Sequence, residues 1–272
     1  MAKNEANEYI LGTEKEELIR LGVQHQVWDA EARKGWEIAE VGPGQTILDL
    51  GSGPGYCTFE LAYIAGPQGK VIAVDKSKNY IDFINKQNEL HGLNIETMHC
   101  DFDEMDLKPN SLDVVYCRWA LAWVPNPEEI LVKLETALAP GGTLIFQEYY
   151  DWSMFQTEPH YPMLAKGIKS ILQSFYDSPG NINVGKKLPG YCYDLGLEVF
   201  SIRPMTKMVT PDQFGWEWPS TFLNIYMPKV VSPKSITEAE VNKALEEFRE
   251  LTMDDEATLL CPQMVEVIAV KV

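Results

Sequence analysis

Apolar and polar residues follow two different periods along the middle of the chain. Short apolar runs, typical of buried strands, alternate with longer stretches that have the spacing of amphipathic helices. This alternation predicts parallel strands joined by right-handed helical crossovers, so we expect an α/β fold. The first five strands are expected at 46–50, 71–75, 95–99, 112–116 and 143–147.

Helix start and stop signals flank the stretches between these strands. A helix-compatible run covers 57–65, and Ser77 as N-cap and Gly92 as stop bound the next helix. Asn126 opens a third helix, because a proline at the first helical position and a carboxylate at the third follow it. The spacing of apolar residues predicts a further helix over 160–176.

The N-terminal part of the chain, residues 1–45, is expected to form a helical segment of its own. Thr13 and Glu16 have the spacing of a capping box, which predicts a first helix. Gly22 then separates this helix from a second run that starts at Gln24.

The last two strands of the sheet are expected at 197–203 and 265–272. The long segment between them, 204–260, predicts a helical insert with capping boxes at Thr210–Gln213 and at Thr237–Glu240. The second box begins an amphipathic helix with one continuous apolar face.

The most informative stretch follows the first strand and reads Asp49-Leu-Gly51-Ser52-Gly53-Pro-Gly55. Glycines let the backbone approach a ligand closely, and the free N–H groups of the following helix favour an electron-rich partner. The G-x-G-x-G spacing differs from the G-x-G-x-x-G of dinucleotide-binding folds, which disfavours a nicotinamide dehydrogenase. Asp75 ends the second strand, where a carboxylate can accept both hydroxyls of a ribose.

Four landmarks stand in register along the chain: the glycine stretch, Val74-Asp75, His99-Cys-Asp101-Phe102 and Leu138-Ala-Pro-Gly-Gly142. Together they resemble the class I S-adenosylmethionine-dependent methyltransferases. Tyr9-Ile-Leu-Gly12 and Arg118-Trp-Ala-Leu-Ala-Trp123 resemble, more narrowly, the branch that methylates small molecules. The resemblance implies a seven-stranded, mostly parallel sheet with helices on both faces and an antiparallel last strand. It also implies S-adenosyl-L-methionine as the cofactor.

The resemblance assigns roles to residues at the carboxyl edge of the sheet. The 51–55 turn would lie under the methionine end of the cofactor, and Asp75 would hold the ribose. Asp101 would bond the adenine amino group, with Phe102 packed on the ring, and the backbone carbonyl of Arg118 would receive the cofactor's amino group. The expected cofactor-binding residues are Asp49, Gly51, Ser52, Gly53, Gly55, Asp75, Lys76, Asp101, Phe102, Arg118 and Tyr9.

Methyl transfer needs an in-line nucleophile, exclusion of water and, for a hydroxyl that is not ionised, a base. Glu148 is the first candidate for a base, because it directly follows the fifth strand. Tyr149, which also follows that strand, and His25 and His160 on flanking helices are the other candidates. Aromatic residues after the fourth and fifth strands would form a wall that faces the acceptor: Trp119, Trp123, Tyr149 and Trp152. The alternative is that half of them simply pack beneath the insert.

The insert is longer than a connecting loop in a compact domain, and such segments are usually functional. It is rich in aromatic residues over 214–226, so we expect it to cap the acceptor pocket. Its helix face at 241–251 would dock on the sheet domain. A dimer interface made from the same apolar surface is the alternative. The expected division is a helical segment (1–45), a cofactor-binding α/β domain (46–203 with 261–272) and a cap (204–260).

Charge and cysteine content limit the kinds of partner that the sequence predicts. The chain has 23 Lys and Arg against 40 Asp and Glu, a net charge of −17, which disfavours nucleic acid and anionic membrane surfaces. The sequence predicts no secretory signal and no membrane-spanning run. Its five cysteines lack C-x-x-C spacing, so we expect reduced thiols, no metal centre and a cytoplasmic location. A monomer and a homodimer are both compatible with the sequence.

The leading hypothesis is an enzyme that moves the methyl group of S-adenosylmethionine to an O, N or C nucleophile of a small-molecule acceptor. The main alternative is a non-catalytic S-adenosylmethionine-binding or partner-activating protein, because the cofactor motifs would be the same. Cys57 and Cys117 would both lie near the site, as thiolates do in arsenite methyltransferases. That family's cysteine pattern is not matched in register, so this alternative is weaker.

Overall fold

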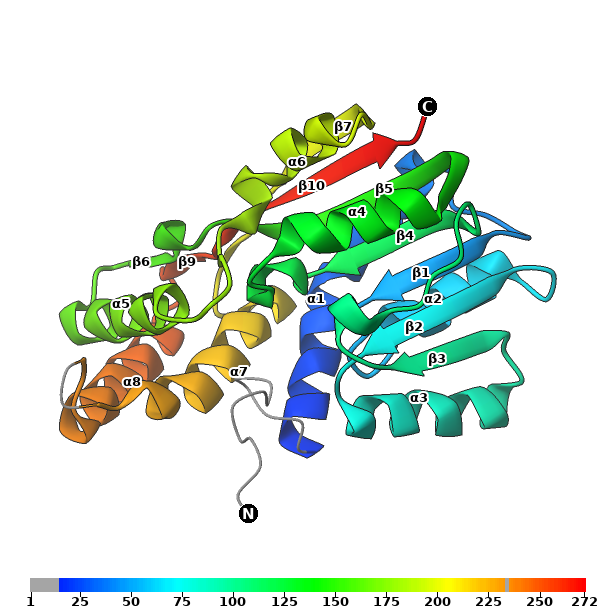
Figure 1. Ribbon diagram of the computed structural model, residues 1–272. Coiled ribbons are helices and arrows are strands. Elements are labelled where there is room, and N and C mark those ends of the chain that lie inside the picture. The colour runs from blue at the N-terminus through cyan, green and yellow to red at the C-terminus, as the bar shows by residue number, and fades with distance from the viewer. Residues whose placement is uncertain (1–14, 233–234) are drawn as a thin grey trace, which may run out of the picture.

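The computed structural model describes residues 15–232 and 235–272 and has an α/β sheet at its centre (Figure 1). The strands of the main sheet are β1 (Thr46–Leu50), β2 (Lys70–Asp75), β3 (Ile95–His99), β4 (Leu112–Arg118), β5 (Leu138–Asp151), β7 (Glu198–Met205) and β10 (Gln263–Val270). Their order is β3-β2-β1-β4-β5-β10-β7. β1 to β5 run parallel, whereas β10 is antiparallel to both of its neighbours. The predicted fold class is confirmed.

Helices cover both faces of this sheet, because the strand residues alternate between two apolar clusters. One face packs against α1 (Lys15–Ile38), α2 (Tyr56–Ala65) and α3 (Lys78–His91). The other packs against α4 (Pro127–Ala137) and α6 (Leu188–Asp194). The predicted caps of α3 are confirmed: the Ser77 side chain accepts a hydrogen bond from the backbone of Tyr80, and Gly92 ends the helix in the left-handed region.

The predicted break at Gly22 is wrong, since α1 is one helix of 24 residues. Gly22 serves packing instead: a Cβ there would lie 2.9 Å from the hydroxyl of Tyr56. That hydroxyl donates to the backbone carbonyl of Leu18 at 3.0 Å, which fixes α1 against the start of α2. Thr13, the N-cap expected for this helix, lies outside the described residues.

A second group of elements lies together beside the carboxyl ends of the strands (Figure 1). Its members are β6 (Gln156–Glu158), α5 (Pro162–Tyr176), β8 (Met208–Val209), α7 (Glu217–Tyr226), α8 (Glu238–Thr252) and β9 (Thr258–Leu260). The short strands form a separate antiparallel sheet in the order β6-β9-β8, which the sequence did not predict. The segment 204–260 is therefore not wholly helical.

The two capping boxes expected in this segment have different outcomes. The box at Thr237 and Glu240 is confirmed at the start of α8. At Thr210 and Gln213 only a long side-chain hydrogen bond forms, at 3.4 Å, and α7 begins later at Glu217. The box at Thr210–Gln213 is therefore wrong as a helix start, because a 3-10 turn intervenes.

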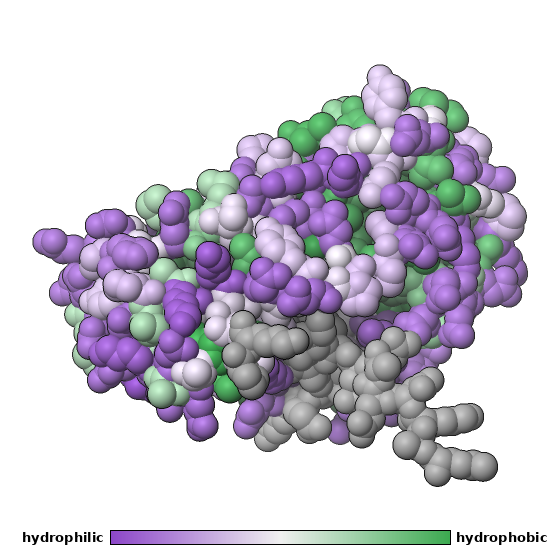
Figure 2. All heavy atoms as spheres, turned by 60° about the vertical axis from the view of Figure 1, so that its left-hand side comes forward, coloured by the Kyte–Doolittle hydropathy of each residue, from purple (hydrophilic) through white to green (hydrophobic). Residues whose placement is uncertain are grey.

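The apolar face of α8 is buried, as its periodicity predicts, but against α5 and not against the main sheet itself. α7 packs instead on α1, which brings the segment 204–260 to the carboxyl edge of the sheet. The face shown in Figure 2, on the side of α5 and α8, carries mostly hydrophilic side chains. No helix within 15–232 and 235–272 is long and apolar enough to cross a membrane.

Candidate active site

A cavity of about 510 Å³ opens at the carboxyl ends of β1, β2 and β4. In an open parallel sheet this edge is where ligands bind, because loops diverge there and helix N-termini face the crevice. Most of the predicted site residues line it: Asp49, Gly51, Ser52, Gly53, Asp75, Lys76, Asp101, Phe102, Arg118, Trp119 and Trp123. The other expected residues, Gly55, His25, Glu148, Tyr149 and Trp152, do not line it. Tyr9 lies outside the described residues.

The glycines of the β1–α2 turn all have positive φ, but they are required for two different reasons. A Cβ at Gly51 would lie 2.3 Å from the Cβ of Ala120, and one at Gly55 would lie 2.7 Å from the side chain of Ile84. These two glycines let the turn pack closely on its neighbours. A Cβ at Gly53 would meet no protein atom within 4 Å, and this residue lines the cavity. Only at Gly53 is the space kept free for a ligand.

Asp75 holds this turn in place from the end of β2. One carboxylate oxygen accepts from the backbone N–H of Gly53 and the other from that of Ser77, both at 2.8 Å. Burial raises the pKa of Asp75, an effect that these two backbone donors oppose. Each oxygen keeps a second lone-pair direction, so the carboxylate can still accept hydrogen bonds from a ligand.

Asp49 lies deeper, near the floor of the cavity. Its Oδ2 accepts a hydrogen bond from the hydroxyl of Thr58 at 2.6 Å. Burial raises the pKa of Asp49 to about 6, an effect that the hydrogen bond from Thr58 opposes. Asp49 therefore both forms a hydrogen bond to α2 and lines the cavity.

Two buried polar atoms of the cavity wall have no hydrogen-bond partner among the described residues. They are the hydroxyl oxygen of Ser52 and Nη1 of Arg118. Buried polar atoms are normally paired, so these two are suited to receive groups of a bound ligand. Together with the carboxylate of Asp75 and the open space at Gly53, they fit a polar nucleoside cofactor with an amino-acid tail.

His25, one of the candidate bases, lies behind Arg118. Nη2 of Arg118 donates to Nδ1 of His25 at 3.1 Å, so this ring nitrogen carries no proton. The other ring nitrogen, Nε2, is 3.0 Å from a carboxylate oxygen of Glu60 and is therefore the donor. Since both nitrogens are engaged and the residue does not line the cavity, its position does not suit the predicted role of base.

Glu148, the first candidate base, is fully buried and does not line the cavity either. Its Oε1 accepts from the backbone N–H groups of Ala120 and Leu121 at 2.9 and 2.8 Å. Burial raises the pKa of Glu148 to about 8. Glu148 was expected just after the fifth strand, but it lies inside β5, and its carboxylate holds the loop after β4 and does not line the cavity.

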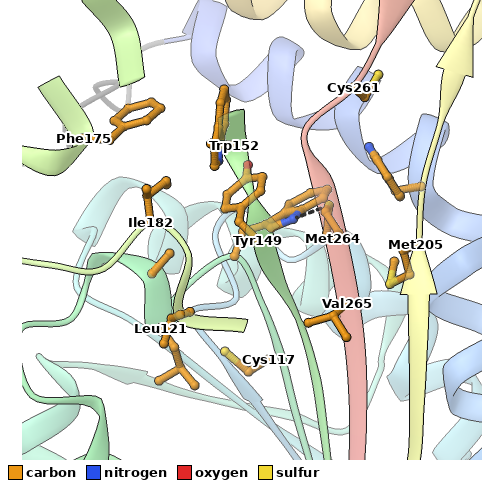
Figure 3. Packing of buried hydrophobic residues seen from close by; sticks show 14 of the residues in the cluster. Cys117, Leu121, Tyr149, Trp152, Phe175, Ile182, Met205, Cys261, Met264 and Val265 are labelled. Carbon is orange, nitrogen blue, oxygen red and sulfur yellow. Dashed lines mark hydrogen bonds between the residues drawn. The ribbon is translucent and has the colours of Figure 1, made fainter. Parts of the chain in front are cut away.

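The predicted aromatic wall has two rows. Trp119 and Trp123 line the cavity, whereas Tyr149 and Trp152 pack behind them. Figure 3 shows Tyr149 and Trp152 together, with Phe175 of α5 beyond them. Tyr149 stacks on Trp119, and the ring of Trp152 lies 5.1 Å from that of Phe175.

Trp119 is the centre of this wall and has an unusual backbone, with φ of 58°. Its ring stacks on Trp218 of α7 at 6.1 Å and meets the edge of Trp28 of α1 at 5.9 Å. Its indole nitrogen donates to the sulfur of Met264 at 3.0 Å. Trp218 was not among the predicted site residues, because nothing in its local sequence distinguishes it from the other aromatic residues of the insert.

The thiols do not form a pair at the cavity. Cys57 lines it, and burial raises the pKa of its thiol to about 12. Cys117 is directed away, and its thiol lies 3.7 Å from a carboxylate oxygen of Glu148. The structure therefore does not bring together the two thiolates that a metalloid acceptor would need.

Comparison with known proteins shows which family this cavity belongs to. Residues 42–178, half of the chain, match the sequence model of a methyltransferase domain. The chain belongs to this family. It is an S-adenosylmethionine-dependent methyltransferase, as the sequence predicted.

Individual relatives of this methyltransferase are distant. It is 27% identical over 209 residues to a demethylmenaquinone methyltransferase of Bacillus licheniformis, covering 71% of this chain and 87% of that protein. A candidate methyltransferase of Bacillus halodurans superposes with a TM-score of 0.59 at 15% identity, covering 89% and 99% of the two chains. The geranyl diphosphate C-methyltransferase of Streptomyces coelicolor superposes with a TM-score of 0.52 at 19% identity, covering 85% and 71%. At these identities the structures show the shared fold alone.

Proposed function

We propose that this methyltransferase acts on a small-molecule acceptor that binds in the cavity beside Trp119 and Trp123. The volume of the cavity carries the proposal. A site of about 510 Å³ is in the range of small-molecule pockets and has to hold both the cofactor and the acceptor. The names of relatives support it, since one acts on a demethylmenaquinone and another on geranyl diphosphate.

The residues divide between the two ligands. Asp75, Ser52 and the 51–55 turn would hold S-adenosylmethionine, which supplies an electrophilic methyl group when it is bound. Trp119 and Trp123 would contact the acceptor with apolar, polarisable faces. The accepting atom is an O, N or C atom, depending on which small molecule is the acceptor.

The residues of this chain would accelerate the reaction mainly by positioning the acceptor and excluding water. Tyr149 stacks on Trp119 and contacts Trp152 behind it, which holds the Trp119 ring in place. Trp218 of α7 also stacks on the Trp119 ring. We therefore propose that α7 acts as part of a cap over the acceptor. Glu148 would be a positioning residue, since its carboxylate holds the loop that carries Trp119.

Transfer of a labelled methyl group tests this function. The protein would be incubated with methyl-labelled S-adenosylmethionine and, in separate reactions, a low-molecular-mass metabolite extract, a protein extract and total RNA. We expect label only in the metabolite fraction, and none with the Gly53→Val variant. Label that appears only in the protein or RNA fraction would contradict a small-molecule acceptor.

A further inference from the structure

The Arg118 side chain places a positive charge in the cavity wall that no direct ion pair neutralises. Arg118 ends β4 and lines the cavity, and none of the ion pairs formed by the described residues includes it. One amino group, Nη2, donates to His25, and the other, Nη1, is buried without a partner. A guanidinium in this state has lost hydration without a full replacement, which is energetically costly.

The carboxylates around Arg118 are already engaged elsewhere. Asp49 accepts from Thr58, and Glu60 accepts from His25 and Arg33. His25 itself is neutral toward Arg118, because its Nδ1 is the acceptor of their hydrogen bond. Asp49 and Glu60 therefore attract the guanidinium from a distance, but no carboxylate of the described residues forms a direct ion pair with it or bonds Nη1.

The guanidinium is also held in a defined orientation. Its Cζ lies 4.7 Å from the centre of the Trp119 ring, a cation–π contact on one side. On the other side His25 is fixed by Glu60 and by stacking on Tyr56, with the ring centres 5.7 Å apart. Two rigid neighbours thus orient Nη1 before any ligand arrives, which reduces the entropy lost on binding.

We propose that Nη1 of Arg118 is an anion-binding site for a carboxylate or another ionised oxygen of a ligand in the cavity. Two ligands have this chemistry: the cofactor, through its amino-acid carboxylate, and an acceptor that carries an ionised oxygen. A charge-assisted bond from a preorganised arginine is among the stronger polar contacts in proteins. The acceptor source rests on the proposed function, whereas the cofactor source does not.

Binding measurements on wild type and Arg118→Gln separate these sources. The first compares S-adenosylmethionine with its decarboxylated analogue by calorimetry. If the carboxylate is the partner, the variant loses at least tenfold in affinity for S-adenosylmethionine and keeps its affinity for the analogue. The second titrates benzoate and neutral benzamide into protein saturated with S-adenosylhomocysteine, followed by tryptophan fluorescence. If the partner is an acceptor, benzoate binds to the wild type but not to the variant, whereas benzamide binds to both proteins with the same affinity.

Arg33→Gln is the matched control, because it removes another arginine near Glu60 that does not line the cavity. Arg118→Lys keeps the charge and serves if the glutamine variant does not fold. The proposal is overturned if Arg118→Gln discriminates S-adenosylmethionine from its decarboxylated analogue, and benzoate from benzamide, to the same extent as wild type. These readouts are binding constants, so a failure to find a methylated small molecule would leave the cofactor result interpretable.

Discussion

The carboxylate of Glu148 accepts a hydrogen bond from the backbone N–H of Ala120 at 2.9 Å. Glu148 lies inside the sheet, whereas Ala120 lies in the loop that borders the cavity. Ala120 in turn is the residue that a Cβ at Gly51 would strike. A buried side chain thus connects β5 to the loop after β4, and through that loop to the β1–α2 turn.

Replacing Glu148 should change how stability depends on pH. Its pKa is raised from 4.5 to about 8 in the folded protein, so the folded state binds the proton more tightly than the unfolded state. The contribution of this group to the free energy of unfolding therefore falls as pH rises from about 4.5 to 8. Denaturant unfolding of Glu148→Gln at several pH values should show a weaker fall than wild type. An unchanged pH dependence would show that the group is ionised in the folded protein.

The matched variant Glu148→Ala separates the charge from the hydrogen bonds. Glutamine keeps a carbonyl oxygen for the backbone of Ala120 and Leu121, whereas alanine leaves both N–H groups without an acceptor. Each buried unsatisfied group costs about 1–3 kcal/mol, so alanine should be clearly less stable than glutamine at pH 7. Equal stability of the two variants would mean that water replaces the carboxylate.

Gly53→Val should abolish cofactor binding and leave a cooperative thermal transition. The valine would occupy space that Gly53 keeps open in the cavity, at a strained positive φ. Gly44→Val is a matched control, since Gly44 also has a positive φ and open space around it but does not line the cavity. Both variants should lose stability by roughly 1–2 kcal/mol from backbone strain. If both bind S-adenosylmethionine normally, the turn does not contact it.

Trp218→Leu should reduce acceptor turnover more than cofactor affinity. Trp218 stacks on Trp119 at the cavity, and its indole nitrogen donates to the side chain of Gln24 at 3.0 Å. Trp216→Leu is the control, because Trp216 is equally buried in the same segment but stacks on Phe248. Kinetics with the acceptor found by label transfer would measure the difference. If Trp218→Leu keeps full turnover and instead converts a dimer to a monomer in light scattering, the segment is an interface and not a cap.

The parts of the site that the sequence predicted are those that a short stretch of chain defines. The β1–α2 turn needs glycines in fixed register, Asp75 ends β2, and Asp101 lies two residues after β3, so each is recognisable locally. The direction of a side chain at the end of a strand depends on what packs around it. For that reason Glu148 was expected to face the acceptor, whereas its carboxylate is enclosed by the loop after β4.

Other features depend on contacts between distant segments and carry little local signal. The strands of the small sheet, β6, β8 and β9, have two or three residues each, too few for an alternating pattern. Gly22 resembles a helix stop in sequence, but it stays helical because Tyr56 packs against it. Trp218 enters the wall only because α7 lies on α1.

The most direct test of the account is a calorimetric titration of S-adenosylmethionine into wild type and Asp75→Ala. Asp75 both holds the turn at Gly53 and would accept hydrogen bonds from the ribose, so its removal should weaken binding by ~1.5–3 kcal/mol. Asp82→Ala is the control, because Asp82 is an exposed carboxylate on α3 that pairs with Lys78. We predict one cofactor bound per chain, weakened in Asp75→Ala and unchanged in Asp82→Ala. Equal affinity in wild type and a folded Asp75→Ala variant would show that the cofactor does not bind at this edge of the sheet.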